Sequence, residues 1–387
     1  MALSLVVACS GDDTGDDAGS TAGASSSSDG SSSGAGSSSS GGGSTSGGSE
    51  SDGSSSSSSS ASSSSGGDTT GGGPMGGGFL SPYCSMSPPA GAQVAPALPK
   101  YGGSCPTIET GYDLMSDTAV NVISSSGADR NFAVIAPDDL QADEVLPVIF
   151  MWHWLGGSAK DFYERSEVQD AANVQRFIAV IPEAKGDVLF KWPFTILDTD
   201  ARLEEEFVFF DDMLACVAEQ FNVEANCVSS TGVSAGALFT GQLAGGRGQH
   251  LAAIMPLSGG VGGGTVKPWK SSAHKMPALV LWGGRDDFCV AVDFNKASME
   301  LEDGLIADGH FITECIHNCG HSTPPFDVPM GYTTFAPLWM FALDHPYWLD
   351  DGESPYGGGL PDGYPEWCAV GAGNATERVG ECAGSEC

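Results

Sequence analysis

The sequence predicts an α/β fold built on a mainly parallel sheet with helices on both faces. Strand-like and helix-like segments alternate along the chain after residue 78, and no internal repeat interrupts them. Several of the strand-like segments are apolar throughout, as parallel strands covered on both faces are. A long segment between two of them carries apolar side chains at helical spacing. Together these features favour helices packed on both sides of one sheet.

Seven segments read as strands. In chain order they are 131–137, 146–154, 176–182, 227–232, 252–259, 277–283 and 310–317. Between the third and the fourth, apolar residues recur at spacings of three and four, which predicts one apolar helix face. These residues are Leu203, Phe207, Phe210, Leu214, Val217 and Phe221. Asp198 and Asp200 stand just ahead of them as predicted helix caps.

The composition divides the chain into four parts. Residues 10–78 are almost wholly Ser, Gly, Thr and Asp, and such a segment buries too little apolar surface to fold. We expect a disordered linker there, a folded domain over 79–349 and a Gly-, Pro- and Cys-rich extension over 350–387. The apolar run 1–9 ends in Cys9 and resembles a bacterial lipobox, whose cysteine is lipidated. The alternatives are a truncated export signal or a wrongly chosen start codon, because the run lacks Lys and Arg.

Charge and cysteine content restrict the class of protein further. The 387 residues carry a formal net charge of −34, and most of it remains after the linker is set aside. So acidic a domain should repel nucleic acid and anionic membranes. Of 11 cysteines, ten remain besides Cys9, an even number that fits five disulfides in an oxidising compartment. For one pair, Cys216 with Cys227, a bond from the end of a helix to the next strand is expected.

The strongest chemical motif is G-x-S-x-G at residues 232–236, with Ser234 at its centre. It follows a strand-like run and precedes a segment of small residues, which is the strand-turn-helix context that this motif requires. The turn is so tight that only very small residues fit beside the serine. It would expose the Ser234 hydroxyl and direct the N–H of Ala235 toward an oxyanion.

A serine nucleophile requires a base and an acid that orients the base. In this kind of fold the order along the chain is Ser, then Asp or Glu, then His. Asp286 and Asp287 follow the strand-like run 277–283, and His321 follows the last one. The order fits. Spacing alone does not choose between the two aspartates, of which at most one can orient the histidine.

In combination, these motifs resemble the secreted α/β-hydrolase esterases of the polyhydroxybutyrate depolymerase, feruloyl esterase and acetylxylan esterase group. The resemblance covers about residues 105–345. It rests on "FMWHWLGGSA", "FFDDMLACVAEQFNV", "TGVSAG", "PLSGG", "LVLWGGRDD" and "CGHSTP". It implies an α/β-hydrolase fold and ester hydrolysis through an acyl-enzyme, with Ser234 as nucleophile, His321 as base and Asp286 or Asp287 as the orienting acid. No cofactor is expected.

The oxyanion strand departs from the pattern of these esterases. Where they have His-Gly, this chain has His153-Trp154, followed by Leu155. We expect the second oxyanion donor to be the backbone N–H of Trp154 or of Leu155. Trp152 and Trp154 could shape the substrate pocket, although packing in the core is expected for at least one of them. Trp192, Trp269 and Trp282 could line a cleft, with core packing as the default.

The segment "CIHNCGH" at 315–321 allows a second interpretation. Cys315, His317, Cys319 and His321 alternate, and alternate residues of a strand share a face, so a metal site is conceivable. Zinc sites usually need wider spacing and a turn, and an oxidising compartment favours disulfides over thiolates. We therefore expect no metal. His317 is expected to be structural, and Cys315 and Cys319 cannot pair with each other within one extended strand.

Two functional hypotheses result. The first is an esterase, secreted or held on the outer surface as a lipoprotein, that acts on extracellular esters, which could be polymeric, and contacts a membrane only through Cys9. The second is a catalytically silent, surface-tethered binding protein with a hydrolase fold. The complete Ser-Asp-His order favours the first, and the altered oxyanion strand favours the second.

Overall fold

The structure is a computed structural model that describes residues 83–112, 119–327, 330–382 and 387. The lipobox-like segment with Cys9 and the linker expected over 10–78 lie outside the described residues. The folded domain belongs to the unit Gly73–Cys387.

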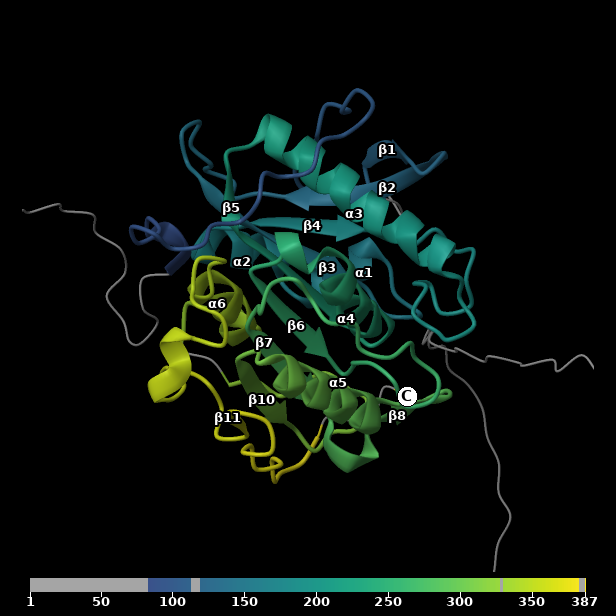
Figure 1. Ribbon diagram of the computed structural model, residues 1–387, viewed down its shortest axis with the longest axis vertical. Helices are drawn as coiled ribbons and strands as arrows, with labels where there is room; N and C mark the ends of the chain where they lie inside the picture. Colours follow the sequence, from purple (N-terminus) through teal and green to yellow (C-terminus); the bar gives the residue numbers. More distant parts are fainter. Residues whose placement is uncertain (1–82, 113–118, 328–329, 383–386) are drawn as a thin grey trace, which may run out of the picture. The chain divides into compact units, whose positions relative to one another are not determined.

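A nine-stranded sheet forms the centre of this unit (Figure 1). Its strands, in spatial order, are β1 (Asn121–Ser125), β2 (Ala128–Ile135), β4 (Ile178–Pro182), β3 (Leu146–Trp152), β5 (Val223–Val233), β6 (Ala253–Leu257), β7 (Ala278–Trp282), β10 (Ile312–Ile316) and β11 (Cys368–Val370). The six strands from β4 to β10 are parallel, and β1, β2 and β11 are antiparallel to their neighbours. All seven predicted strands are confirmed, and so is the α/β-hydrolase type of fold.

Helices cover both faces of the sheet. They are α1 (Ala159–Arg165), α2 (Val168–Gln175), α3 (Asp200–Gln220), α4 (Ala235–Arg247), α5 (Phe294–Asp308) and α6 (Ala336–Asp344). Side chains of β3 alternate between two buried clusters: Phe150 and Trp152 belong to the cluster that includes side chains of α3, α4 and α5, whereas Ile149 and Met151 belong to the one that includes side chains of α1, α2 and α6. Figure 1 shows α3 and α5 crossing in front of the sheet. This double coverage explains why the parallel strands are apolar throughout.

The predicted helix is α3, but its predicted caps are wrong. The cap is Thr199, whose backbone is extended and whose hydroxyl accepts a hydrogen bond from the N–H of Arg202 at 3.2 Å. Asp200 is the first helical residue, and Asp198 accepts from the N–H of Thr195 at 2.8 Å instead. The side chain of Asp198 is thus engaged in the turn before the helix.

Five disulfides join all ten cysteines other than Cys9, as their even number predicts. The pairs are Cys84–Cys227, Cys105–Cys216, Cys289–Cys387, Cys315–Cys368 and Cys319–Cys382. The predicted pair of Cys216 with Cys227 is therefore wrong. Cys216 packs in the cluster on the α3 face, whereas the partner of Cys227, Cys84, contacts a carbonyl of α6 on the other face. The sheet lies between them.

A short two-stranded ribbon, β8 (Phe288–Cys289) and β9 (Val292–Asp293), stands outside the central sheet. It connects the loop after β7 to the start of α5 and was not predicted. Among the helices of the described residues, none combines the length and apolarity that a membrane crossing requires.

Candidate active site

Ser234 occupies the turn between β5 and α4. Its backbone has φ 55° and ψ −117°, a conformation that costs free energy for any residue with a Cβ. The glycines on either side make the turn possible. A Cβ on Gly232 would lie 2.3 Å from the carbonyl of Gly236, and one on Gly236 would lie 2.0 Å from the carbonyl oxygen of Trp152. The glycine spacing of the motif is thus a steric requirement of this turn.

Three sequence-predicted residues form one hydrogen-bonded series. His321 Nε2 lies 2.8 Å from Ser234 Oγ, and His321 Nδ1 lies 2.7 Å from Asp287 Oδ1. They come from the loops that follow β5, β7 and β10, three strands of the parallel part of the sheet. Because parallel strands end at the same edge, residues more than 80 positions apart meet there.

Of the two adjacent aspartates, only Asp287 enters this series. Its side chain is fully buried, and its second oxygen, Oδ2, accepts from the N–H of Gly283 at 2.8 Å. Asp286, one residue earlier in a 3₁₀ turn, is exposed to solvent. A carboxylate that accepts two hydrogen bonds in a buried site is held in one orientation, which a solvated carboxylate is not.

The loop of His321 packs directly on the loop of Asp287. The N–H of Gly320 donates to the carbonyl of Gly283 at 3.1 Å, and a Cβ on Gly283 would lie 1.8 Å from the carbonyl oxygen of Gly320. Phe294, the first residue of α5, stacks on the imidazole of His321 with ring centroids 4.1 Å apart. The sequence did not indicate Phe294 or this role of Gly283. In the sequence, the glycines of "GGRDD" and "CGH" are the only signal that could have indicated so close an approach of the two loops.

Of the residues expected to form the oxyanion hole, Ala235 directly follows the serine, and Trp154 and Leu155 follow a strand end that packs against the start of α4. Ala235 is the first residue of α4, where backbone N–H groups have no partner within the helix. Trp154 and Leu155 follow the end of β3. The start of α4 lies against that end, since a Cβ on Gly236 would be 2.9 Å from the carbonyl oxygen of His153. Ala235 and the segment 153–155 are therefore neighbours.

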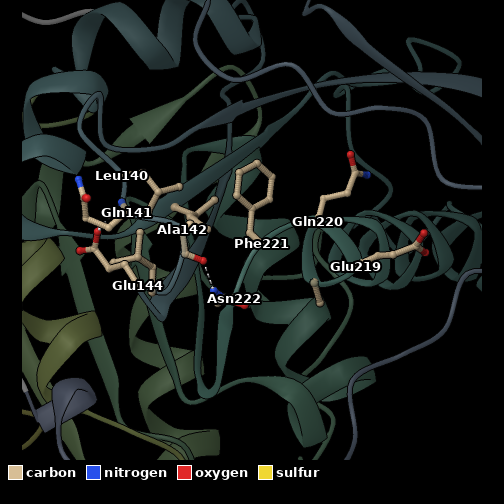
Figure 2. A pocket seen from close by; sticks show the side chains of 11 residues that line it. Leu140, Gln141, Ala142, Glu144, Glu219, Gln220, Phe221 and Asn222 are labelled. Carbon is tan, nitrogen blue, oxygen red and sulfur yellow. Dashed lines mark hydrogen bonds between the residues drawn. The ribbon is translucent and has the colours of Figure 1, made fainter.

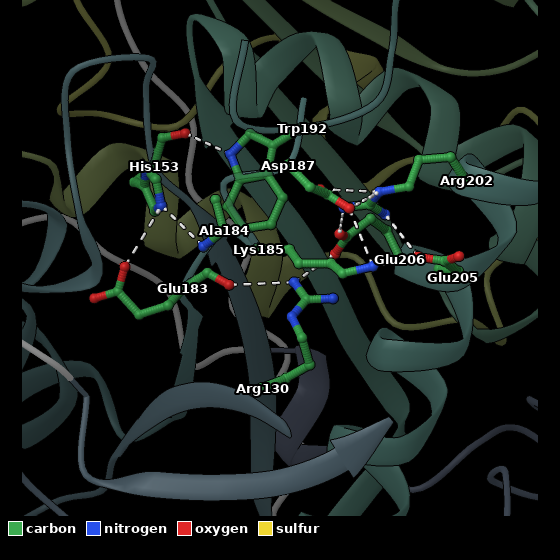
Figure 3. Close-up of polar contacts among 10 residues, drawn as sticks. All are labelled: Arg130, His153, Glu183, Ala184, Lys185, Asp187, Trp192, Arg202, Glu205 and Glu206. Carbon is green, nitrogen blue, oxygen red and sulfur yellow. Dashed lines mark hydrogen bonds and ion pairs between the residues drawn. The ribbon is translucent and has the colours of Figure 1, made fainter. Parts of the chain in front are cut away.

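His153 holds the backbone of this segment, and Figure 3 shows its contacts with Ala184 and Trp192. Its Nδ1 lies 2.8 Å from the carbonyl of Trp154, its Nε2 accepts from the N–H of Ala184 at 3.3 Å, and its own carbonyl accepts from Trp192 Nε1 at 2.8 Å. Burial lowers the pKa of His153 to about 4. The imidazole is therefore neutral, with its proton on Nδ1. Ala184 is a further contact that the sequence did not indicate.

The loop after β4 that supplies Ala184 and Trp192 is itself pinned to α3 (Figure 3). Buried Arg130 donates to the carbonyl of Glu183 at 3.2 Å and to the carboxylate of Glu206 at 2.8 Å. Arg202 forms a second link, to Asp187 at 2.7 Å. These bonds hold the loop that supports His153.

The tryptophans considered as pocket residues differ in burial. Trp152 and Trp192 are fully buried and pack edge to face at 5.0 Å, so both belong to the core. Trp154 is half-buried, and its ring lies against Phe162 of α1, with Arg165 stacked over it at 5.3 Å. Trp269 and Trp282 donate hydrogen bonds to Asp308 and Asn295, respectively.

The structure also places the other residues of "CIHNCGH". Cys315 and Cys319 are both in disulfides and cannot act as thiolate ligands. His317 is fully buried, its Nδ1 accepts from the N–H of Cys319 at 3.2 Å, and burial lowers its pKa to about 4. Across the described ranges, no three His, Cys, Asp or Glu residues are grouped so that they could hold a metal ion.

A surface pocket of about 370 Å³ lies elsewhere (Figure 2). Leu146 and Ile178, the first residues of β3 and β4, line it together with Phe221 at the end of α3. It therefore opens at the amino end of the parallel strands, whereas Ser234 lies at their carboxyl end. None of the sequence-predicted site residues contributes to it.

The chain is similar in sequence to a known esterase. It is 27% identical to feruloyl esterase D of Neurospora crassa over 169 residues, which are 43% of this chain and 56% of that protein. It thus spans about half the length of this curated relative. No protein-family model matches the chain.

Solved structures extend the comparison over most of the described domain. A complex of pOPH_S172C with DMSO has a TM-score of 0.54 and 17% identity, covering 70% of this chain and 96% of that one. Native sOPH has a TM-score of 0.52 and 18% identity, covering 69% and 97%. At these identities the structures show the fold. The sequence match and the fold together confirm that this chain resembles the α/β-hydrolase esterases, the group that its motifs indicate.

Proposed function

We propose that the chain is an exported, serine-dependent carboxylic ester hydrolase that acts through an acyl-enzyme. The observation that carries the proposal is the series Ser234–His321–Asp287 at a strained strand-to-helix turn. Strain and burial of this kind are maintained where they serve a reaction. The similarity to feruloyl esterase D supports esters as the class of substrate.

The geometry supports a reaction in two stages. Ser234 Oγ attacks the ester carbonyl carbon while its proton moves to His321 Nε2, 2.8 Å away. Asp287 accepts from His321 Nδ1 and stabilises the imidazolium that forms. The N–H of Ala235, at the positive end of the α4 dipole, and that of Trp154 or Leu155 bind the oxyanion. His321 then returns the proton to the departing alcohol, and water repeats the sequence to release the acid.

The altered oxyanion strand is compatible with this activity. Oxyanion donors are backbone N–H groups, so a tryptophan can replace the usual glycine if its side chain lies clear of the serine. The ring of Trp154 packs against α1, and neutral His153 holds the backbone of the segment. We therefore favour catalysis over the silent binding protein.

The disulfides bear on where the protein acts, and an extracellular location restricts the classes of substrate. The five disulfides support folding in an oxidising compartment, and so a secreted protein or an outer-surface lipoprotein. Polyhydroxyalkanoates and plant-wall acyl esters are the two classes of extracellular ester that we propose to test.

Hydrolysis of p-nitrophenyl acetate and butyrate tests the proposal. Ser234→Ala should lower kcat on the order of a thousandfold or more, because nothing else in the site can form the acyl-enzyme. The matched control is Ser258→Ala: Ser258 directly follows the neighbouring strand β6, is buried and also has a positive φ of 51°. It should retain activity. Equal background rates from folded wild type and Ser234→Ala would favour the silent binding protein instead.

A further inference from the structure

The two loops that carry Asp287 and His321 are attached to the same part of the chain. We name residues 377–382 together with Cys387 the tail clamp. One disulfide, Cys319–Cys382, begins two residues before His321, and another, Cys289–Cys387, begins two residues after Asp287. Each loop of the acid–base pair is thus bonded covalently to the tail clamp.

Polar contacts reinforce the bond to the His321 loop. The N–H of Arg378 donates to the carbonyl of Ile316 at 2.9 Å, where β10 ends. The guanidinium of Arg378 donates to Asn318 Oδ1 at 2.8 Å, and Asn318 Nδ2 donates back to the carbonyl of Gly380 at 2.8 Å. The tail clamp therefore packs along the turn 316–319, and this turn leads directly to His321.

The tail clamp also touches the Asp287 loop away from the disulfide. A Cβ on Gly284 would lie 3.0 Å from the carboxylate of Glu377, so this side chain rests against Gly284. Gly284 has φ 75° and accepts from the N–H of Asp287 at 3.1 Å. A single segment is therefore in contact with both sides of the hydrogen bond between Asp287 and His321.

The chain just before the tail clamp is fixed to the central sheet. β11 pairs with β10, and the disulfide Cys315–Cys368 joins the two strands. Glu314, on β10, accepts from the N–H of Gly373 at 2.9 Å and of Ala375 at 2.7 Å. The tail clamp thus extends from a rigid support, so it can restrain the loops.

We propose that the tail clamp positions the catalytic acid and base relative to each other. The proposal rests on the proposed function, which gives Asp287 and His321 their roles. Apart from the tail clamp, the bond from Gly320 to Gly283 and the stacking of Phe294 hold these loops together. A misplacement of about 1 Å in a catalytic group can cost about a hundredfold in rate, so a covalent restraint at this point affects turnover more than substrate binding.

The experiment removes tail-clamp disulfides from the full oxidised chain. The variants are Cys319→Ser/Cys382→Ser and Cys289→Ser/Cys387→Ser. The matched control, Cys105→Ser/Cys216→Ser, removes a disulfide near the end of α3, the helix that packs on β1 at the opposite edge of the sheet from β11. With p-nitrophenyl butyrate, kcat of the tail-clamp variants should fall about tenfold to a hundredfold while KM stays within about twofold. The control variant should have the wild-type kcat when it is assayed at a temperature well below its own unfolding temperature.

A second readout does not depend on ester turnover. The proton that His321 Nδ1 shares with Asp287 should give a downfield ¹H NMR signal in the wild type and in the control. The signal should broaden or vanish in the tail-clamp variants. If those variants fail to fold, Arg378→Met replaces them, because it breaks the bond to Asn318 but keeps all five disulfides, and the same two readouts apply.

The outcomes separate the two proposals. Unchanged kcat and an unchanged signal in the tail-clamp variants would overturn the positioning role. An equal loss in the control pair would also overturn it, because the effect would then be a general loosening of the fold. If the wild type hydrolyses no ester, the proposed function fails, and the NMR signal alone decides whether the tail clamp orders Asp287 and His321.

Discussion

Asp286 and Asp287 are adjacent in sequence, yet the side chain of Asp286 is exposed to solvent and that of Asp287 is buried. Both follow the same strand and the same glycine pair, so sequence spacing treats them alike. The chain makes one 3₁₀ turn over Gly284–Asp286, and successive side chains of such a turn point about 120° apart. This rotation directs Asp286 outward and leaves Asp287 to face His321.

The choice between the two acids gives a direct prediction. In Asp287→Asn, an amide replaces a carboxylate that accepts from both His321 Nδ1 and the N–H of Gly283. The amide NH₂ must face one of these two donors, so the histidine loses the partner that holds its tautomer. We expect kcat for p-nitrophenyl butyrate to fall by a factor on the order of 10⁴, as in serine hydrolases with this substitution.

Asp286→Asn is the matched control for this substitution. It changes the charge of the same loop by the same amount, but at an exposed side chain. Its kcat should stay within about twofold of wild type, because exposed charges interact weakly with a buried site. If Asp286→Asn were the inactive variant, the side-chain assignment would be wrong.

The site residues differ in how far the sequence could predict them. Ser234 lies in a local motif, and His321 and the two aspartates follow from chain order, so the sequence names them. The supporting contacts of Phe294 and His153 depend on which loops meet at the carboxyl edge of the sheet. That is a property of tertiary packing, and no local pattern encodes it.

Among the elements, the buried strands were predicted and the edge strands were not. β1 has only five residues and alternates between buried and exposed side chains, and β11 has three residues in a Cys-rich segment. Short edge strands bury little apolar surface, so their sequences carry a weak signal. The six parallel strands could be predicted from the sequence because burial on both faces makes them apolar throughout.

A buried carboxyl lies where α5 packs on β10. Glu302 of α5 is buried near Glu314 of β10, and burial, followed by this neighbouring charge, raises the pKa of Glu302 to about 9. The folded chain therefore holds a proton that the unfolded chain releases above its ordinary pKa of 4.5. The free energy of unfolding should fall as the pH rises between these two values, by up to about 1.4 kcal/mol per pH unit from this group.

Glu302→Gln removes this titration while keeping an amide that can donate to Glu314. The variant and the wild type should have similar stability near pH 4, and the variant should become the more stable as the pH rises toward 9. Urea unfolding at several pH values measures the difference. Glu219→Gln, at an exposed carboxyl on α3, should show no such divergence. Parallel pH curves for wild type and Glu302→Gln would mean that the folded state does not hold the proton.

Across the whole molecule, the number of disulfides was predictable and their connectivity was not. The even count of cysteines reflects composition. Each partner depends on which face of the sheet a cysteine occupies, and this separates Cys216 from Cys227 despite their closeness in sequence. Four of the five bonds involve segments outside the nine-stranded sheet: two tie the start of the described chain, and two tie the tail clamp.

These bonds predict that the chain folds stably only where disulfides form. They join residues 53 to 143 positions apart, and closing loops of that length stabilises the folded state by roughly 4 kcal/mol or more per bond, because the unfolded chain loses conformational entropy. The sum exceeds the net stability of about 5–15 kcal/mol that is typical of a domain. Complete reduction by dithiothreitol should therefore unfold the chain at room temperature, as seen by circular dichroism.

Thiol titration makes this prediction quantitative. The unreduced chain, denatured, should release at most one thiol, that of Cys9, because the other ten cysteines are paired. Adding dithiothreitol in steps should expose thiols together with loss of the folded signal and of esterase activity. A reduced chain that keeps its unfolding temperature would show that the core alone stabilises the fold. The disulfides would then no longer support export as the route by which this protein reaches its substrate.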